Sequence, residues 1–408
     1  MKRTLITNIG MLATPQGTAA RGGRAQGEIC ILKNAWILIE NDLIAQVGTS
    51  AAPAAADAQT INAGGKLVTP GLVDAHTHLI FGGWRQNELA LKLHGAGYLD
   101  ILAAGGGILS TMRATQSASE EQLEAKASAA LDEMLRFGTT TAEAKSGYGL
   151  STGEECKALR VIGNLQKRHV MDLAATFMGA HAVPEAYRDN RQGYLELLCE
   201  EMLPAVWEQG IAEFCDVFCE KGVFSAEESR RILLAGRQHG LRPKIHADEI
   251  EAIGGSELAG EIGAVSAEHL IVCPPSGIAS MAEGGTVACC LPATSFYLGA
   301  AYAPVQDMVQ AGVPVAMATD FNPGSCPCLN MQLVISLGCL RYRLTPEQAL
   351  TAVTLNGAAA ICRADRIGSI EPGKQADILI WNAEDLDYIC YRLGSNLVDT
   401  VIKKGNVV

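Results

Sequence analysis

The chain has 408 residues, which is enough for one (β/α)8 barrel of about 250 residues plus a smaller domain. Its residues are 48% hydrophobic and 19% charged, which argues against a disordered protein. The net charge of −12 comes with no block of Lys or Arg, so we expect no nucleic-acid partner and no membrane partner. Thirteen cysteines without a regular framework are typical of reduced thiols, and we therefore expect a cytoplasmic protein.

Both ends of the chain carry strand signals. The first residues lack the sustained apolar segment of a signal peptide. Asn41 and Asp42 separate two apolar runs, a pattern that predicts a hairpin. Neither end alone has enough residues for a stable core, so we predict that residues 1–65 and 366–408 combine into one small β-sandwich domain. The strand-like runs are residues 29–32, 35–39, 43–47, 376–381 and 398–403.

Residues 66–365 repeat a short apolar strand, a polar residue at its end and a helical stretch, which is the signature of βα units. Residues 119–137, for example, predict a helix that begins at Ser119 and is ended by Gly138. Because eight strands close a parallel barrel, we predict a (β/α)8 TIM barrel. The predicted strands are residues 72–76, 139–143, 174–178, 215–219, 243–246, 264–269, 287–291 and 315–320.

One uncharged window, residues 284–306, is long enough to span a bilayer. It contains Pro292, Pro304 and several polar residues, which are uncommon in a membrane-spanning helix. We therefore expect a buried strand followed by a loop.

Histidines and one carboxylate gather at the predicted strand ends. His76 and His78 end the first strand, and their spacing of two in extended chain turns both side chains the same way. His246, His269 and Asp320 end the fifth, sixth and eighth strands. Since the strand ends of a barrel meet at one face, three imidazoles and Asp320 can bind Zn²⁺ or another divalent transition metal and leave a position for water. His269 then remains for proton transfer or for stabilising transition-state charge.

A His-x-His pair has a second interpretation. Taken alone, such a pair is more often a surface pair or a satisfied pair of core histidines than a pair of metal ligands. Here residues 68–78 join an apolar strand directly to His76 and His78, and the chain has only eight histidines, four of them at strand ends. This context favours the metal site.

The chain resembles the amidohydrolase superfamily over nearly its whole length, including residues 368–377 (GSIEPGKQAD). Four further stretches resemble one branch of that superfamily: 81–85 (FGGWR), 143–150 (EAKSGYGL), 246–249 (HADE) and 319–325 (TDFNPGS). The resemblance implies one Zn²⁺ or iron ion per subunit, bound by His76, His78, His246 and Asp320. It also implies hydrolysis of the cyclic amide of 4-imidazolone-5-propanoate to N-formimidoyl-L-glutamate in histidine degradation, and a homodimer.

Many binuclear relatives in the superfamily carry a bridging modified lysine at the end of strand four. Strand four of this chain ends in Cys219 and Glu220, so that lysine is missing, which favours one metal ion. Lys145 lies near the end of strand two, where we expect a structural role. Glu220 is the remaining candidate for holding a second ion.

The substrate that the resemblance implies has a carboxylate tail and a planar ring, and each part needs a partner. Arg85 follows a Gly-Gly-Trp turn at the barrel mouth and can bind the carboxylate; the alternative is a surface salt bridge. Tyr148, between Gly147 and Gly149, can approach the ligand or form a plain turn. By the resemblance His181 contacts the substrate, where it could hydrogen-bond the ring carbonyl; a packing role is the alternative.

Glu249 lies three residues after His246 and is the candidate proton shuttle and a substrate-binding residue. Asp320 and His269 are the other candidate catalytic residues, and the division of roles among the three stays open. Asn322, Gly324 and Ser325 follow strand eight and can bind the substrate carboxylate or form a structural turn.

The cysteines lack paired Cys-x-x-Cys zinc spacing, so we expect buried thiols, although Cys326 and Cys328 lie near the predicted pocket. Two other functions remain. A deaminase of a heterocycle such as guanine or cytosine would share His246 and Glu249, and ammonia release would identify it. A non-catalytic barrel would have lost metal ligands, and none is missing here.

Overall fold

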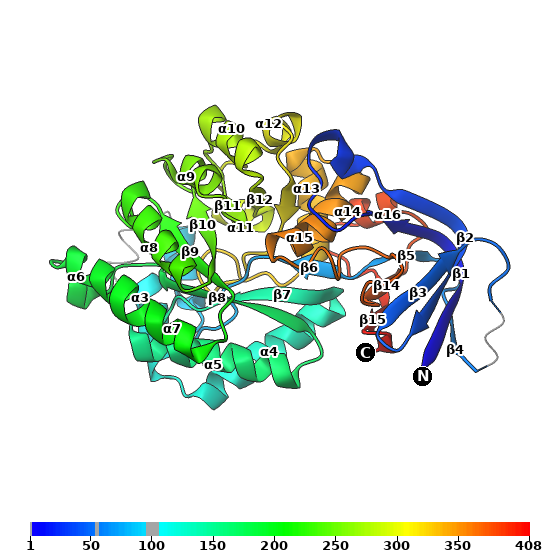
Figure 1. The fold of residues 1–408 in the computed structure, drawn as a ribbon, viewed down its shortest axis with the longest axis horizontal. Coiled ribbons are helices and arrows are strands. Elements are labelled where there is room, and N and C mark those ends of the chain that lie inside the picture. The colour runs from blue at the N-terminus through cyan, green and yellow to red at the C-terminus, as the bar shows by residue number, and fades with distance from the viewer. Residues whose placement is uncertain (1, 54–56, 95–105) are drawn as a thin grey trace.

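The computed structural model describes residues 2–53, 57–94 and 106–408, in which a barrel adjoins a separate sheet built from both ends of the chain (Figure 1). The barrel strands pair in parallel in the order β13-β12-β11-β10-β9-β8-β7-β6. They are β6 (Leu72–Asp74), β7 (Thr139–Lys145), β8 (Asp172–Ala180), β9 (Phe214–Cys219), β10 (Arg242–Ala247), β11 (Ser266–His269), β12 (Val287–Cys290) and β13 (Val315–Met317). The eight predicted strands and the barrel are therefore confirmed.

The residues that follow β6 and β13 close the barrel. The backbone N–H of Asp320 donates to the carbonyl of His76 at 3.0 Å, and the N–H of His78 donates to the carbonyl of Phe321 at 2.9 Å. Thr77 and Phe321 form a parallel bridge at the same place. Closure thus joins two segments that carry candidate site residues.

Helices cover the outside of the barrel (Figure 1). In α4, Ser119 accepts the backbone N–H of Gln122 while the Gln122 side chain accepts the N–H of Ser119, and Gly138 follows the helix at φ +93°. The helix predicted at 119–137 is thus confirmed. The described helices are α1 (Leu89–Leu93), α3 (Ile108–Ser117), α4 (Glu120–Arg136), α5 (Thr152–Arg168), α6 (Arg191–Glu196), α7 (Leu203–Gln209), α8 (Ala226–Gln238), α9 (Gly255–Glu261), α10 (Pro275–Gly284), α11 (Pro292–Leu298), α12 (Val305–Gln310), α13 (Met331–Tyr342), α14 (Pro346–Val353), α15 (Leu355–Ala360) and α16 (Leu386–Tyr391).

The terminal strands form one mixed sheet in the order β16-β15-β14-β5-β1-β2-β3, with β4 also paired to β1. Apolar side chains from both ends of the chain, such as Ile9, Ile37 and Ile378, share one buried core between parts of this sheet. The small β domain that combines both ends is therefore present. Its strands are β1 (Arg3–Thr14), β2 (Cys30–Glu40), β3 (Leu43–Gly48), β4 (Gln59–Asn62), β5 (Leu67–Pro70), β14 (Ile378–Trp381), β15 (Val398–Lys403) and β16 (Asn406–Val407).

The two sheets are joined without a linker, because β5 of the terminal sheet continues through Gly71 into β6 of the barrel. The N–H of Gly71 donates to the carbonyl of Asp377 at 2.9 Å. A Cβ atom at position 71 would lie 2.3 Å from the Thr140 hydroxyl oxygen, so only glycine fits this close crossing.

Within the window 284–306 the predicted strand is present as β12, but the residues after it form α11 instead of a loop. Pro292 stands in the first turn of α11, a position that suits proline because no backbone N–H is needed there. Among the described residues, no helix has both the length and the apolar character needed to cross a bilayer. All thirteen cysteines are free thiols.

Candidate active site

The candidate metal ligands meet at the carboxyl end of the barrel. His76 and His78 follow β6, His246 lies in β10, and Asp320 follows β13. Nε2 of His246 lies 3.3 Å from Nε2 of His78, and Oδ1 of Asp320 lies 3.3 Å from Nε2 of His76 and 3.6 Å from Nε2 of His78. One ligand atom from each of His76, His78 and His246 falls within 4.8 Å of the others, as do those of His76, His269 and Asp320. The structure thus brings together all the residues predicted to bind the metal.

These groups are buried and incompletely paired. Nε2 of His76 and Oδ1 of Asp320 have no hydrogen-bond partner among the described residues. A buried polar atom without a partner costs about 1–3 kcal/mol, unless a ligand satisfies it. The chemistry of the atoms that converge here, imidazole nitrogens and a carboxylate oxygen, suits a divalent transition metal.

The electrostatics also favour a cation at this place. Burial lowers the pKa of His78 well below its ordinary value, and the neighbouring histidines add to this effect, so His78 is neutral and can act as a ligand. Burial also opposes charge on His76, but Glu268 outweighs it and raises the pKa of His76 to about 9. For Asp320, contacts with His76, His269 and Thr294 outweigh burial and lower its pKa to about 2. The protein therefore stabilises positive charge beside an ionised carboxylate.

Two site residues adopt an uncommon backbone conformation. His269 has φ +72° and Asp320 has φ +56°, in the left-handed region where a non-glycine residue costs roughly 1–3 kcal/mol. The Asp320 N–H is held by His76, and its Oδ2 accepts the Thr294 hydroxyl at 2.7 Å. The barrel thus holds the carboxylate in place against this strain.

Carboxylates behind the ligands complete the site. Oε2 of Glu268 contacts Nδ1 of His76, and the Asp216 carboxylate lies 3.1 Å from Nδ1 of His246. An acceptor at Nδ1 leaves Nε2 free to bind a metal. Glu268 and Asp216 were not among the predicted site residues, although each lies in a predicted strand; a charged residue in an otherwise apolar strand is the signal that could have found them.

His181 and Tyr148 form one wall of the site. The His181 ring stacks on His78 with 4.8 Å between centroids, and the Tyr148 ring lies 5.1 Å from His181. Nδ1 of His181 is 3.0 Å from the carbonyl of Gly147, and burial lowers the pKa of His181 to about 3. Because a carbonyl only accepts, the neutral ring carries its proton on Nδ1, and its Nε2 is an acceptor.

Arg85 lies on the loop after β6 and is largely buried. Its Nε and Nη2 donate to the two carboxylate oxygens of Glu88 at 2.9 and 2.8 Å. Glu88 is itself buried, so this pair differs from the surface salt bridge considered as the alternative. The Arg85 guanidinium packs on Gly324, where a Cβ atom would lie 2.1 Å from Nη1. The structure therefore places Arg85 beside the loop that follows Asp320.

Asn322 organises that loop. Its side-chain oxygen accepts the N–H groups of Gly324 and Ser325 at 2.8 and 2.7 Å, and its amide nitrogen donates to the carbonyl of Asp320 at 2.7 Å. The side chain of Asn322 is thus engaged in forming the turn. Gly324, in the same turn, lies beside Arg85.

Glu249 lies close to the proposed proton-transfer groups. Its Oε2 is 3.6 Å from Nε2 of His269. Burial raises the pKa of Glu249 to about 8, and the negative charges of Asp320 and Glu220 add to this effect. Burial lowers the pKa of His269 to about 3. At neutral pH the pair therefore consists of a protonated carboxyl group and a neutral imidazole.

The comparisons with known proteins agree with this geometry. A model of the amidohydrolase family matches residues 67–408. The chain belongs to the amidohydrolase family. The amidohydrolase is 50% identical to a protein of Alkaliphilus metalliredigens named imidazolonepropionase, a match that covers 100% of this chain and 98% of that protein. It is 48% identical to a Bacillus cereus protein of the same name, covering 100% and 97%.

Solved structures share the fold of this amidohydrolase. A triazine hydrolase variant has a TM-score of 0.76 at 17% identity and covers 100% of this chain and 94% of its own. An adenosine deaminase from Xanthomonas campestris, solved with bound zinc, has a TM-score of 0.70 at 21% identity and covers 99% and 92%. The buried cluster of histidines and Asp320 is thus a group of side chains that could hold a metal ion in a member of the amidohydrolase family.

Glu220, the candidate for holding a second ion, is engaged elsewhere. Its carboxylate accepts the backbone N–H groups of Lys221, Ile250 and Glu251. Lys145, for which a structural role was expected, points into the barrel and is fully buried among carboxylates.

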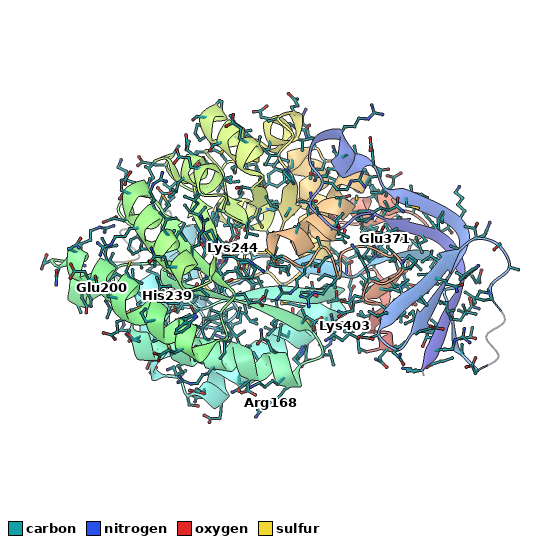
Figure 2. All side chains as sticks on the ribbon, in the orientation of Figure 1. Arg168, Glu200, His239, Lys244, Glu371 and Lys403 are labelled. Atoms are coloured by element: carbon teal, nitrogen blue, oxygen red, sulfur yellow. The ribbon has the colours of Figure 1, made fainter. Side chains whose placement is uncertain are left out.

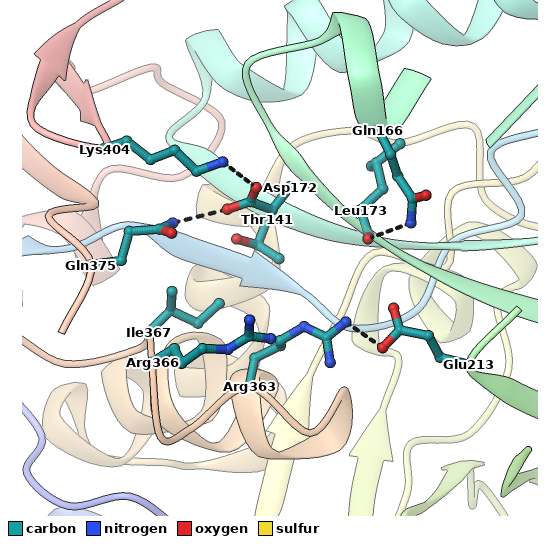
Figure 3. Close-up of a pocket in the computed structure, with 10 residues that line it drawn as sticks. All are labelled: Thr141, Gln166, Asp172, Leu173, Glu213, Arg363, Arg366, Ile367, Gln375 and Lys404. Carbon is teal, nitrogen blue, oxygen red and sulfur yellow. Dashed lines mark hydrogen bonds and ion pairs between the residues drawn. The ribbon is translucent and has the colours of Figure 1, made fainter. Parts of the chain in front are cut away.

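A cavity of about 330 Å³ lies at the other end of the barrel, where the strands begin and the terminal sheet adjoins (Figure 3). In it Asp172 pairs with Lys404 and hydrogen-bonds Gln375, and Glu213 pairs with Arg363 (Figure 3). These contacts join the barrel to residues near the C-terminus, and none of them involves a predicted metal ligand.

Proposed function

We propose that this amidohydrolase is an imidazolonepropionase, which opens the ring amide of 4-imidazolone-5-propanoate with water to give N-formimidoyl-L-glutamate. The observation that carries the proposal is the identity of about half of all residues, over the whole chain, with proteins of that name. The buried metal site at the barrel mouth supplies the chemistry that such a hydrolysis needs.

We propose one Zn²⁺ or iron ion per subunit as the cofactor, held by His76, His78, His246 and Asp320. The unpaired Nε2 of His76 and Oδ1 of Asp320 support this ligand set. When bound, such an ion polarises a carbonyl group and lowers the pKa of water toward about 7. We assign substrate binding and proton transfer to side chains of the protein.

Arg85 binds the propionate carboxylate of the substrate. Glu88 occupies Nε and Nη2 and holds the guanidinium in a fixed orientation beside Gly324. A guanidinium so fixed loses little conformational entropy when it binds a carboxylate. Burial raises the pKa of Tyr148, the charge of Asp320 adds to this effect and that of Arg85 opposes it, so the phenol stays protonated and can donate a hydrogen bond.

His181 and Tyr148 orient the ring of the substrate. The stacking of His181 on His78 places it beside the metal ligands. Because Nε2 of His181 is an acceptor, its partner is a ring N–H group instead of the ring carbonyl expected from the sequence. This contact fixes which face of the planar ring meets the attacking water.

Proton transfer is divided between two carboxyl groups whose environments differ. Asp320 is ionised, with its pKa lowered to about 2, and accepts the proton of the attacking water. Glu249 is protonated at neutral pH and donates a proton to the ring nitrogen as the C–N bond breaks. His269, 3.6 Å from Glu249, is neutral and donates a hydrogen bond to the oxygen on which negative charge develops.

The test follows the ultraviolet absorbance of freshly generated imidazolone propionate with purified, metal-loaded protein. We expect rapid loss of the absorbance with the native chain, and little with His246→Ala or Arg85→Ala. Ammonia release from guanine and cytosine is measured in parallel. A protein that leaves the imidazolone untouched and releases ammonia from a base would be the deaminase instead.

We also propose that the enzyme acts as a homodimer in the cytoplasm. Phe296 and Leu298 of α11 are exposed apolar side chains, which supports a contact with a second copy. Sedimentation velocity of the purified chain tests the dimer; a single species of monomer mass over the accessible concentration range would contradict it.

A further inference from the structure

Two lysines lie fully buried inside the barrel beneath the metal site. Lys145 projects from β7 and Lys244 from β10, and neither has exposed surface. Lys244 lies within the barrel in Figure 2. A buried ammonium group is costly unless it is paired and hydrogen-bonded, so each must be held by specific partners.

The partners of Lys145 are three carboxylates. Its Nζ lies 2.7 Å from Oδ2 of Asp216, 2.8 Å from Oε2 of Glu143 and 3.0 Å from Oε2 of Glu268. The Asp216 contact is a hydrogen bond, and the Glu143 and Glu268 contacts are ion pairs with the same ammonium group. Lys244 shares two of the acceptors, Oε1 of Glu143 at 2.7 Å and Oε1 of Glu268 at 2.8 Å.

Two of the three carboxylates also contact ligand imidazoles. Oε2 of Glu268 contacts Nδ1 of His76, and the Asp216 carboxylate contacts Nδ1 of His246 at 3.1 Å. Glu143 hydrogen-bonds Thr176 and Lys244, forms an ion pair with Lys145, and makes no hydrogen bond to a ligand imidazole among the described residues. Lys145 is therefore the side chain that connects the partners of both imidazoles.

Which ring nitrogen of a metal-binding imidazole carries the proton depends on the partner of the nitrogen that does not bind the metal. A carboxylate beside Nδ1 keeps the proton there and leaves the Nε2 lone pair for the metal. A carboxylate can rotate about its last torsion unless its oxygens are held. Asp216 and Glu268 approach from different strands, and the Lys145 ammonium holds an oxygen of each.

We propose that Lys145 is a positioning residue of the metal site, which through Asp216 and Glu268 fixes both His246 and His76 with Nδ1 protonated and Nε2 directed at the metal. The inference rests on the ligands assigned in the proposed function. Neither readout below requires turnover, so a wrong substrate assignment would leave it standing.

The first readout is Zn²⁺ affinity, measured by competition with a chromophoric chelator. We expect Lys145→Met, which matches the length of the side chain and removes its donors, to bind Zn²⁺ about 10- to 100-fold more weakly, as is usual for lost outer-shell partners. Glu143→Gln is the matched control, since it perturbs the same buried network at a carboxylate that makes no hydrogen bond to a ligand imidazole among the described residues. We expect its affinity to stay within about threefold of the native value.

The second readout is the Nδ1–H proton signals of the zinc-loaded protein labelled with ¹⁵N-histidine, a tractable set because the chain has eight histidines. Lys145→Met should shift or broaden the signals of both His76 and His246. Asp216→Asn should affect His246 alone, and Glu268→Gln His76 alone. These single-carboxylate variants also decide the matter if Lys145→Met does not fold.

Two results would overturn the proposal. One is native zinc affinity and unchanged Nδ1–H signals in Lys145→Met. The other is a Glu143→Gln variant that loses zinc affinity and both Nδ1–H signals to the same extent as Lys145→Met or the single-carboxylate variants. The buried network would then act on the site only through the general stability of the protein.

Discussion

Gly324 contributes to the site through the side chain that it lacks. Its backbone supports the Arg85 guanidinium, and a Cβ atom there would lie 2.1 Å from Nη1 and 2.8 Å from Cζ. We expect Gly324→Ala to displace Arg85 and to raise KM for the imidazolone about tenfold or more, which corresponds to about 1.4 kcal/mol of lost binding. Initial-rate kinetics on the purified variant measure this.

Gly153→Ala is the control for that substitution, because a Cβ atom there meets nothing within 4 Å. Its KM should equal the native value. An unchanged KM in Gly324→Ala as well would show that the substrate carboxylate does not depend on this placement of Arg85.

A substitution of Glu249 tests the chemical step separately from metal binding. Glu249→Gln keeps the shape of the side chain but removes the proton that it delivers, so kcat should fall about 10²- to 10⁴-fold. Metal content, measured by atomic absorption, should stay native. Glu251→Gln, which alters an exposed carboxylate paired with Lys221, should keep full activity. A fall in kcat of less than about fivefold in Glu249→Gln would reject the proton role.

The candidate ligand residues could be predicted from sequence, whereas the contacts made by the groups behind them could not. His76, His246 and Asp320 stand at strand ends, and the ends of parallel barrel strands always meet at one face. Glu268 and Asp216 lie within strands, where the direction of each side chain depends on register, and register is set by pairing with distant strands. Such charged residues can be buried only when other groups pair with them, and the sequence does not show which groups those are.

At the scale of single elements, the predicted start of helix α4 can be tested by removing its cap. Ser119 and Gln122 form the reciprocal cap seen in the structure. We expect Ser119→Ala to destabilise the first turn by about 0.5–2 kcal/mol, which corresponds to about 2- to 30-fold faster amide exchange there. Hydrogen exchange followed by mass spectrometry resolves this segment.

Ser128→Ala, in the middle of the same helix, is the matched control, because Ala is the better helix former at an interior position. Exchange in the first turn should be unchanged by it. Equal exchange in Ser119→Ala and the native chain would mean that the cap does not hold the first turn.

Some elements escaped prediction for local reasons. In β1 the residues between Ile6 and Ile9 include Asn8 at φ +53°, and a shift in the pairing register at this point interrupts the alternation of apolar and polar residues. In α11 only seven residues form the helix, too few for a periodic pattern to stand out from a loop. Longer elements such as α4 have clear start and stop signals.

At the scale of the whole molecule, Asp172 links the barrel to the terminal sheet. Lys403 and Lys404 contact its carboxylate at 2.7 and 2.6 Å, and Gln375 donates to it at 2.9 Å. Burial opposes its charge, but the two lysines outweigh this and lower its pKa to about 2. Since an unfolded aspartate has a pKa of about 3.9, the ionised form favours the folded state.

The sign of this effect gives a pH prediction. The stability contributed by Asp172 should be fully present above about pH 5 and should disappear as the pH falls from about 4 toward 2. Thermal unfolding of the native chain and of Asp172→Asn should therefore differ at pH 6 and converge at low pH. Glu208→Gln, at an exposed position, should follow the native curve throughout. A difference that persists unchanged to pH 2 would contradict this origin.

The uninterrupted passage from β5 into β6 has a mechanical consequence. Pro70 ends a strand held by the terminal sheet, and His76 lies only six residues further along the backbone. A force applied to the C-terminus, as in an optical trap, would act on β15 and β14 and through them on β5. The predicted ligands His76 and His78 would thus be disturbed as soon as the small sheet gives way.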